Sequence, residues 1–287
     1  MTDALQAPRG LARRHRRLSD EETERRMLQA ATAVINKTGL TVSLDHLSFE
    51  DVIRDARVSR SAVYRRWPYK DLFFSDLLRE LARAAAPAAT SSAETSVVPI
   101  RRFVLEHFDS LATAEPRRDL VLELMRQASL WDFETMFGST EWRTYLALHA
   151  TFLSVADEEL RSDLQTALAQ SERDFIERIA ASWEFLAGLL GLRLRPEVDA
   201  TFETIASLVS AVARGLVIMS LASPEIAKVP IRAKLFGAAQ SAEWSPAAIA
   251  ITSIATTFLE SDPNVSWDAE RLAQVRRALE STGPATT

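Results

Sequence analysis

Residues 59–66 concentrate side chains that can bind an anionic, hydrogen-bonding partner. The stretch reads Ser-Arg-Ser-Ala-Val-Tyr-Arg-Arg, so two hydroxyls, one phenol and three guanidiniums recur within about two helical turns. Such groups hydrogen-bond phosphate oxygens, and arginine also binds the O6 and N7 atoms of guanine in the major groove. The stretch therefore has the chemistry needed to contact double-stranded DNA. The alternative is that the arginines only form a solvated face, as most charge runs do.

Two short helices are expected to position these side chains, with the tight joint Arg57-Val58 between them. Ser48 and Ser59 each stand where a hydroxyl can accept an N–H bond from the first turn of a helix. Pro68 disfavours helix at the residue before it, so the second helix is predicted over residues 60–66. Arg57 stands in the turn itself, which predicts either an unusual backbone conformation for a residue other than glycine or a different turn.

A third helix is expected upstream of this pair. Ser19 followed by Glu22 has the spacing of a capping box, and Gly39 stands at the expected C-terminal cap. Five arginines fall within residues 9–17, where apolar content is too low for independent folding. Residues 1–18 are therefore predicted to form a flexible basic arm.

In order and spacing, residues 20–80 resemble the DNA-binding domain of the TetR (tetracycline repressor) family. The resemblance is carried by Val58-Ser59, Val63-Tyr64, Trp67, Lys70-Asp71 and Leu72-Phe73. Arg57 replaces the glycine usual in the turn, and the connection over residues 39–48 is longer than usual, which suggests an extra turn around residues 42–47. The resemblance implies a helix-turn-helix domain over residues 19–82.

The resemblance also assigns candidate DNA contacts, and among them we expect Arg60 and Arg65 to reach base edges. Lys70 would meet a phosphate at the start of the following helix. Tyr64 has an alternative interpretation as ordinary core packing, because tyrosine is amphipathic. The full set is Ser59, Arg60, Ser61, Ala62, Tyr64, Arg65 and Lys70.

Charge is divided unevenly along the 287 residues. The formal net charge is −5, yet residues 1–80 carry 15 Lys and Arg against 12 Asp and Glu, and the remainder carries 19 against 27. A DNA duplex would repel the acidic remainder, so the molecule would approach the duplex in one orientation, with its N-terminal part toward the DNA. The asymmetry therefore indicates two domains with different partners.

The chain beyond residue 97 is predicted to be a helical bundle over residues 97–282. Glycine is scarce and the alternation typical of strands is absent, whereas residues 90–96, rich in Ser and Thr, suggest a surface loop. The expected helices are 97–113, 117–130, 139–156, 157–191, 197–222, 246–260 and 267–281. The predicted fold class is all-α, with an N-terminal three-helix helix-turn-helix domain followed by a helical domain for ligand binding and dimerisation.

Residues 197–222 and 246–260 are similar in place and character to the helices that form the TetR four-helix dimer interface. A two-fold pair of reading helices would match both halves of a palindromic site. The alternative is an ordinary core helix within one chain, because a helix apolar nearly all round is usually buried. The candidate interface residues are Phe202, Ile205, Val209, Val212 and Leu216.

Large aromatic side chains gather in the middle of the predicted bundle, with a few polar groups among them. Apolar walls with sparse polar contacts are typical of a small-molecule site, and also of any helical core that contains aromatics. The predicted effector is an unidentified small molecule of apolar or aromatic character. The candidate ligand-binding residues are His107, Arg126, Trp131, Trp142, Tyr145, His149 and Trp183.

Signatures of catalysis, cofactors and membrane insertion were sought and not found in the sequence. It contains no Gly-rich phosphate loop, no GxSxG and no HExxH, and its four histidines are scattered, so no enzyme activity, cofactor or metal site is expected. The chain has no cysteine and no apolar signal segment, which fits a cytoplasmic protein. Arg214 interrupts the longest apolar run, so no membrane span is expected.

Together these observations predict a DNA-binding transcriptional regulator. It would bind a palindromic operator as a homodimer, with repression as the default role that the family resemblance implies and activation as the other option. One alternative is a helical enzyme or small-molecule carrier that retains an N-terminal helix-turn-helix. Another is a protein-interaction adaptor that works through the basic arm.

Overall fold

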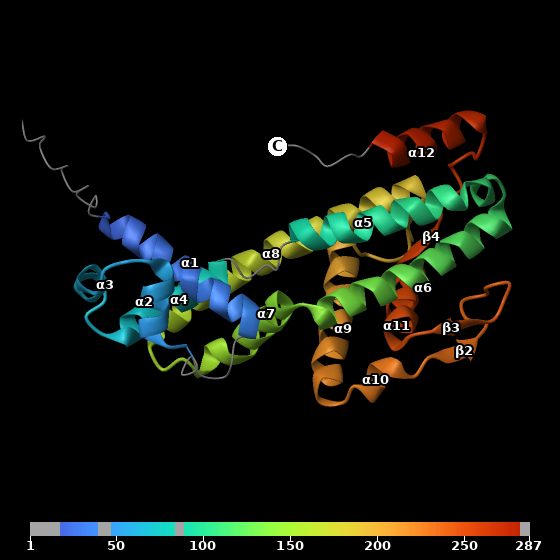
Figure 1. The fold of residues 1–287 in the computed structure, drawn as a ribbon. Coiled ribbons are helices and arrows are strands. Elements are labelled where there is room, and N and C mark those ends of the chain that lie inside the picture. The colour runs from blue at the N-terminus through green and yellow to red at the C-terminus, as the bar shows by residue number, and fades with distance from the viewer. Residues whose placement is uncertain (1–17, 40–46, 84–88, 282–287) are drawn as a thin grey trace, which may run out of the picture.

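The computed structural model describes residues 18–39, 47–83 and 89–281, except for the side chains of residues 89–97, 227, 228 and 281. The described chain is predominantly helical, with an N-terminal head and a larger helical body (Figure 1). The helices are α1 (Asp20–Thr38), α2 (Phe49–Ala56), α3 (Arg60–Arg66), α4 (Lys70–Arg83), α5 (Ala89–Glu106), α6 (Ala114–Gly138), α7 (Thr140–Thr151), α8 (Glu158–Leu189), α9 (Phe202–Ala222), α10 (Glu225–Lys228), α11 (Pro246–Phe258) and α12 (Ala269–Ser281). This arrangement confirms the all-α fold class.

Four short strands and two single-turn helices complete the described elements. The strands are β1 (Leu192–Leu194), β2 (Ile231–Ala233), β3 (Ala242–Trp244) and β4 (Leu259–Ser261), and the 3-10 helices are η2 (Phe108–Ala112) and η3 (Phe152–Ser154). β1 pairs antiparallel with β4, and β2 pairs antiparallel with β3. The expectation that strands are absent was wrong at these two places, because a strand of three residues is too short to show alternation.

The helix predicted to start at residue 97 begins earlier, at Ala89. The predicted loop over residues 90–96 was therefore wrong, since these residues belong to α5. Helix propensities of Ser and Thr lie within about 0.7 kcal/mol of alanine per residue, so a Ser/Thr-rich stretch does not by itself exclude a helix. The tertiary context can override such a weak preference.

The head is a three-helix unit whose helices begin at the predicted caps. The N–H of Glu22 donates to Ser19 Oγ at 3.1 Å and that of Asp51 donates to Ser48 Oγ at 3.3 Å. Ile35 and Val63 are fully buried and belong to one apolar cluster with Phe73 of α4. The predicted basic arm (residues 1–18) and the extra turn predicted around residues 42–47 fall almost entirely outside the described residues.

The apolar core continues from the head into the body through α8. Leu77 of α4 is buried in the same cluster as Leu164 and Phe175 of α8. Arg79 of α4 also donates to Asp163 of α8, with 2.8 Å between Nε and Oδ2. At about 1.5 Å per residue, the 32 residues of α8 extend roughly 48 Å, so this helix runs from the head far into the body (Figure 1).

By length and hydropathy, α9 is the one described helix that meets the criteria for a membrane span, although a third of its most apolar window is buried within the protein. It packs against α8 and α11, and Arg214 at its middle pairs with Glu172 of α8. Packing inside the bundle accounts for the buried side of α9, whereas Leu208, Ile218 and Met219 leave an apolar face of the helix exposed.

Candidate DNA-contacting surface and ligand cavity

The joint between α2 and α3 is a one-residue left-handed turn. Arg57 adopts φ 54° and ψ 44°, and its N–H reaches the carbonyls of Ile53 and Arg54. The predicted unusual conformation of this residue is thus confirmed. Only Arg57, Val58 and Ser59 separate the end of α2 from the start of α3.

Helix α3 has the predicted bounds and is held by one buried face. Its first turn is capped by Ser59, whose Oγ accepts the N–H of Ala62 at 3.3 Å. Val63 is fully buried and Trp67, at the C-terminal end, is 1% exposed, with its ring N–H donating to Asp76 Oδ2 at 2.9 Å. Burial of these two side chains fixes which face of α3 turns to solvent.

The outward face of α3 carries the side chains selected from the sequence. Ala62 is half-buried, and the other candidates are exposed: Ser59, Arg60, Ser61, Tyr64, Arg65 and Lys70. Tyr64 packs edge-on against Phe49 while leaving its hydroxyl outside. The ring of Tyr64 therefore packs within the head while its phenol faces solvent, and the DNA contact of this residue stays a prediction.

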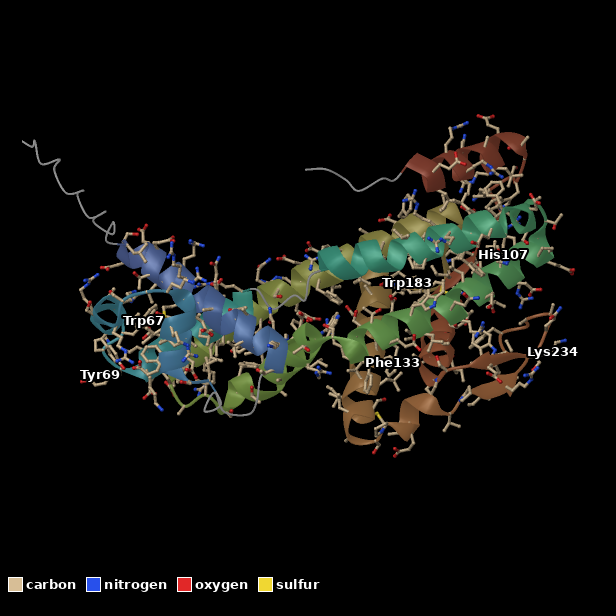
Figure 2. All side chains as sticks on the ribbon, in the orientation of Figure 1. Trp67, Tyr69, His107, Phe133, Trp183 and Lys234 are labelled. Atoms are coloured by element: carbon tan, nitrogen blue, oxygen red, sulfur yellow. The ribbon has the colours of Figure 1, made fainter. Side chains whose placement is uncertain are left out.

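One exposed aromatic residue was missed by the sequence reasoning. Tyr69, between α3 and α4, is 73% exposed and extends away from the head, whereas Trp67 turns inward (Figure 2). Its position directly before Lys70 and directly after Pro68 was the available signal. Tyr69 lies at the edge of the same surface and enlarges it.

Each arginine of α3 is paired with a carboxylate of a neighbouring helix. Arg60 Nη2 lies 2.7 Å from Glu50 Oε2, and Arg66 Nη2 lies 3.2 Å from Glu24 Oε2. Arg65 pairs with Asp20. All these side chains are at least one third exposed, and exposed ion pairs contribute only about 0–1 kcal/mol each. Such pairs can exchange for phosphate contacts at low cost.

The same carboxylate that holds Arg60 also accepts the Tyr64 hydroxyl. The Tyr64 Oη to Glu50 Oε1 distance is 3.0 Å, and this hydrogen bond is the main cause of the raised pKa of Tyr64. Tyr64 therefore stays protonated and available as a donor. Glu50 organises two of the groups that face outward.

A second feature is a cavity of about 190 Å³ in the body, enclosed chiefly by α6, α8 and α9. Its surface is mostly apolar, and Trp142 and Trp183 contribute to it. Figure 2 shows Trp183 within the body, remote from Trp67 and Tyr69 in the head. The polar groups on its wall include Asp132 and Arg214, neither of which was selected from the sequence. Arg214 had been noted only as an interruption of an apolar run.

Arg214 connects the cavity wall to a polar cluster between α7, α8 and α9. Its Nη1 lies 2.9 and 2.8 Å from the two oxygens of Glu172, which also accepts the Tyr145 hydroxyl. Burial opposes the charge of Glu172, but the bonds from Arg214 and Tyr145 outweigh it and lower the pKa. Arg214 Nε and Nη2 are buried and have no hydrogen-bond partner in the part of the chain that the structure describes. The guanidinium thus retains unused donors beside the cavity.

The structure brings only part of the predicted ligand set to this cavity. Tyr145 and His149 belong to the polar cluster around Glu172 rather than to the cavity wall. His107 stacks on Phe103, and Trp131 lines a separate shallow depression. Arg126 pairs with Glu123 and donates to the carbonyl of Glu243. Sequence spacing could not separate these sites, because α6 alone contributes residues to the cavity, to the depression lined by Trp131 and to the Arg126–Glu123 pair.

The five candidate interface residues of α9 lie mainly on its inner side. Ile205 is fully buried, Val209 lines the cavity, and the remaining three are half-buried: Phe202, Val212 and Leu216. The exposed face of α9 carries other apolar side chains, namely Leu208, Ile218, Met219 and Leu221. A surface for a second copy would therefore be centred on this neighbouring face.

Comparison with known proteins gives structural likeness at low identity. Neither a family model nor a curated protein matches the chain. A TetR-family transcriptional regulator from Agrobacterium tumefaciens aligns with TM-score 0.41 and 16% identity, covering 71% of this chain and 90% of that one. TylP, a TetR regulator from Streptomyces fradiae, aligns with TM-score 0.38 and 13% identity, covering 90% of this chain and 98% of TylP.

A third solved structure is SmeT, the repressor of the Stenotrophomonas maltophilia multidrug efflux pump SmeDEF. It aligns with TM-score 0.37 and 16% identity, covering 83% of this chain and 93% of SmeT. Two of the three are described as regulators of the TetR family, which residues 20–80 resemble. Scores and identities this low carry no inference about what this chain binds, so function has to be inferred from its own surfaces.

Proposed function

We propose that this chain is a DNA-binding transcriptional regulator that responds to a small molecule and acts as a homodimer. The observation that carries the proposal is the exposed, arginine-bearing face of α3. The buried Val63 and Trp67 hold α3 so that Arg60, Ser61 and Arg65 all face outward. A helix presented in this way after a tight turn can enter the major groove of a duplex.

In the proposed complex, Arg60 and Arg65 exchange their carboxylate partners for guanine edges. Ser59, Ser61 and Tyr64 donate to phosphates, and Lys70 binds a phosphate near the N-terminus of α4. The net cost is small, because the pairs given up are exposed. Phosphate contacts position the head, and the two arginines supply sequence preference.

Dimerisation would use the exposed apolar face of α9. Ile218 and Met219 are each about half exposed, at 52% and 51%, and Leu208 lies on the same side of the helix. Ala211 and Gly215 lie between them and allow close approach of a partner helix. A two-fold pair would place two α3 helices toward successive major grooves, one helical turn of DNA or a multiple apart.

The effector site would be the cavity lined by Trp142 and Trp183. Its volume of about 190 Å³ suits a small apolar or aromatic molecule. Helix α8 contributes Phe175 and Trp183 to the wall, and its other end is tied to α4 through Asp163 and Arg79. A ligand that binds one placement of α8 more tightly would favour one spacing of the two heads. The equilibrium between the spacings, and hence the DNA affinity, would change by at most the ratio of the ligand's affinities for the two placements. Repression of transcription is the default role for such a ligand-responsive regulator, and activation is the other option.

The DNA-binding proposal can be tested without knowing the operator. Sequences that bind the full-length protein would be selected from a random duplex library, and fluorescence anisotropy would then measure their affinity. We expect Arg60→Ala and Arg65→Ala to weaken binding about tenfold or more, because a bidentate base contact contributes about 1–3 kcal/mol. Arg232→Ala is the matched control, since Arg232 is as exposed as Arg60, at 73%, and is also paired with a glutamate.

The control separates specific reading from general attraction to phosphate. The proposal requires Arg232→Ala to stay within about twofold of wild type and the selected pool to share a palindromic sequence. If all three variants bind the pool equally with the same dependence on salt, only nonspecific phosphate attraction is present and the proposal fails.

A further inference from the structure

A second cavity, of about 370 Å³, lies at the other end of α6 from the head. It is enclosed by the first half of α6, by α11, by the β1–β4 pair and by the loop of the β2–β3 hairpin. It adjoins the first cavity, because Met125 lines both and the consecutive residues Ile251 and Thr252 line one each. Thr252 therefore marks the end of the second cavity that borders the first.

Positive charge gathers at the opposite end of this second cavity. Arg117 and Arg118 both line it, and within the described part of the chain neither has a carboxylate in ion-pair range. Arg117 donates to the carbonyl of Leu111 at 2.7 Å and lies over the Trp267 ring, and its burial lowers the pKa of the guanidinium. Two cations without a counter-ion at the mouth of a cavity favour an anionic guest.

The one carboxylate on the wall is already neutralised. Glu260 Oε1 lies 2.8 Å from Arg193 Nη2, and its other oxygen lies 3.7 Å from Arg195 Nη1. Arg195 itself also lines the cavity. Glu260 therefore does not cancel the charge of the first two arginines.

The position of Arg118 is fixed by the hairpin loop. Its Nη2 donates to the carbonyl of Phe236 at 2.8 Å, and a Cβ at Gly237 would lie 2.2 Å from the same nitrogen. Gly237 adopts φ 75°, which a larger residue tolerates poorly. The loop thus contacts the guanidinium of Arg118, whose side chain is otherwise exposed.

The far end of the cavity offers a hydroxyl that has no partner. Thr252 is completely buried and lines the cavity, and its Oγ1 has no hydrogen-bond partner among the described residues. A buried hydroxyl without a partner costs about 1–3 kcal/mol, so a guest that bonds it gains affinity. From Arg118 to Met125 the α6 axis rises roughly 10 Å, with the apolar Val121 and Leu122 in between.

We propose that this second cavity binds a slender amphipathic acid, with a carboxylate at Arg117 and Arg118, an apolar middle, and a hydroxyl or carbonyl at Thr252. The rise of roughly 10 Å along α6 between Arg118 and Met125 matches a chain of about eight carbons. The site is separate from the cavity of the proposed effector, and its occupation does not depend on DNA binding.

Isothermal titration calorimetry on the full-length protein tests this with three probes: octanoate, 8-hydroxyoctanoate and octan-1-ol. We expect octanoate to bind at one site per chain and more tightly than octan-1-ol. Arg118→Gln should lower the affinity for octanoate about tenfold or more, since hydrogen bonds to charged groups are stronger than those between neutral groups. Trp183→Leu, in the other cavity, is the matched control and should stay within about twofold of wild type.

The hydroxyl end has its own test. We expect 8-hydroxyoctanoate to bind about three- to tenfold more tightly than octanoate, as one added hydrogen bond allows, and Thr252→Val to abolish that gain while leaving octanoate binding unchanged. Thermal unfolding followed by circular dichroism checks that each variant is folded, and Arg117→Gln serves if Arg118→Gln is not. The proposal is overturned by absence of saturable binding, by equal affinity for octan-1-ol, or by sensitivity to Trp183→Leu instead of to the arginines. If the wild-type protein binds 8-hydroxyoctanoate no more tightly than octanoate, or if Thr252→Val keeps the preference, the assignment of Thr252 is overturned.

Discussion

Glu50 Oε2 lies 2.7 Å from Arg60 Nη2, so the first arginine of α3 is already engaged within the protein in the absence of DNA. The second oxygen of this carboxylate accepts the Tyr64 hydroxyl. One residue of α2 thereby holds two side chains of the proposed reading surface. It also places a negative charge where DNA phosphates would bind. DNA must therefore compete with the Glu50 carboxylate for Arg60.

We expect Glu50→Gln to strengthen DNA binding by about two- to fivefold. The change removes an exposed pair, and such pairs contribute about 0–1 kcal/mol, while it also removes a charge that repels phosphate. Fluorescence anisotropy over a range of salt concentrations would measure it. Glu243→Gln, which breaks the pair with Arg232 on the hairpin, should leave DNA affinity unchanged. Weaker binding by Glu50→Gln would show instead that its ordering of Arg60 and Tyr64 outweighs its charge.

The left-handed turn at Arg57 predicts a difference between two small substitutions. Arg57→Gly should give a free energy of unfolding about 1 kcal/mol higher than Arg57→Ala, because only a residue with a Cβ pays the steric cost of φ 54°. Urea denaturation of both variants measures this difference. Equal stabilities would mean that the turn relaxes into another conformation once the arginine side chain is removed.

His149 predicts how stability depends on pH. Burial lowers its pKa below 6.5, despite the opposing effects of the Tyr145 carbonyl and of Glu172. The folded protein therefore holds a proton at this site less readily than the unfolded chain, so stability is lost as pH falls below about 6.5. The pKa of Glu172 is lowered from 4.5, so its own effect appears only at more acidic pH.

Thermal unfolding of wild type and His149→Gln at pH 7.5 and 5.5 isolates this contribution. The midpoint temperature of unfolding should fall more between pH 7.5 and 5.5 in the wild type than in the variant, because the variant lacks the titrating ring. A larger loss in His149→Gln would contradict the assigned direction and would indicate that the imidazolium is stabilised by Glu172, whose Oε2 lies 3.8 Å from the ring.

The exposed face of α9 predicts the oligomeric state. Ile218→Glu should convert a dimer into a monomer in sedimentation equilibrium, because a charge would be buried at the centre of the contact. Leu153→Glu is the control, since Leu153 is also an exposed apolar residue, at 69%, but lies in η3. Dissociation caused by both variants, or by neither, would place the contact elsewhere.

Local signals in the sequence were sufficient to predict the helix bounds around the turn in the head. Ser59 and Pro68 bracket α3, and the bounds they predict, residues 60–66, are those of the structure. Capping hydroxyls and a proline act on the residues next to them, so their effect can be read without knowing the fold. The loop expected over residues 90–96 failed because a Ser/Thr-rich composition is a weak preference with no such local geometry behind it.

The cavities could not be assembled from sequence for a different reason. Each draws residues from elements far apart along the chain, as Met125, Arg214 and Trp183 illustrate for the first cavity. The direction each side chain takes depends on how helices rotate about their axes, and α9 shows the consequence. Its apolar residues were recognised, but the five chosen for the interface are buried or half-buried in one chain, and the exposed ones are Leu208, Ile218, Met219 and Leu221, so the choice of interface residues stays a prediction.

Dimethyl sulfate footprinting on a selected DNA sequence is the most direct test of whether α3 enters the major groove. Dimethyl sulfate methylates guanine N7, which is the atom that Arg60 and Arg65 are proposed to cover. The account predicts protected guanines in two half-sites whose centres are about one helical turn or a multiple apart, with at least one protection per half-site lost in Arg60→Ala. Unchanged methylation at saturating protein, or a pattern identical in wild type and Arg60→Ala, would contradict it.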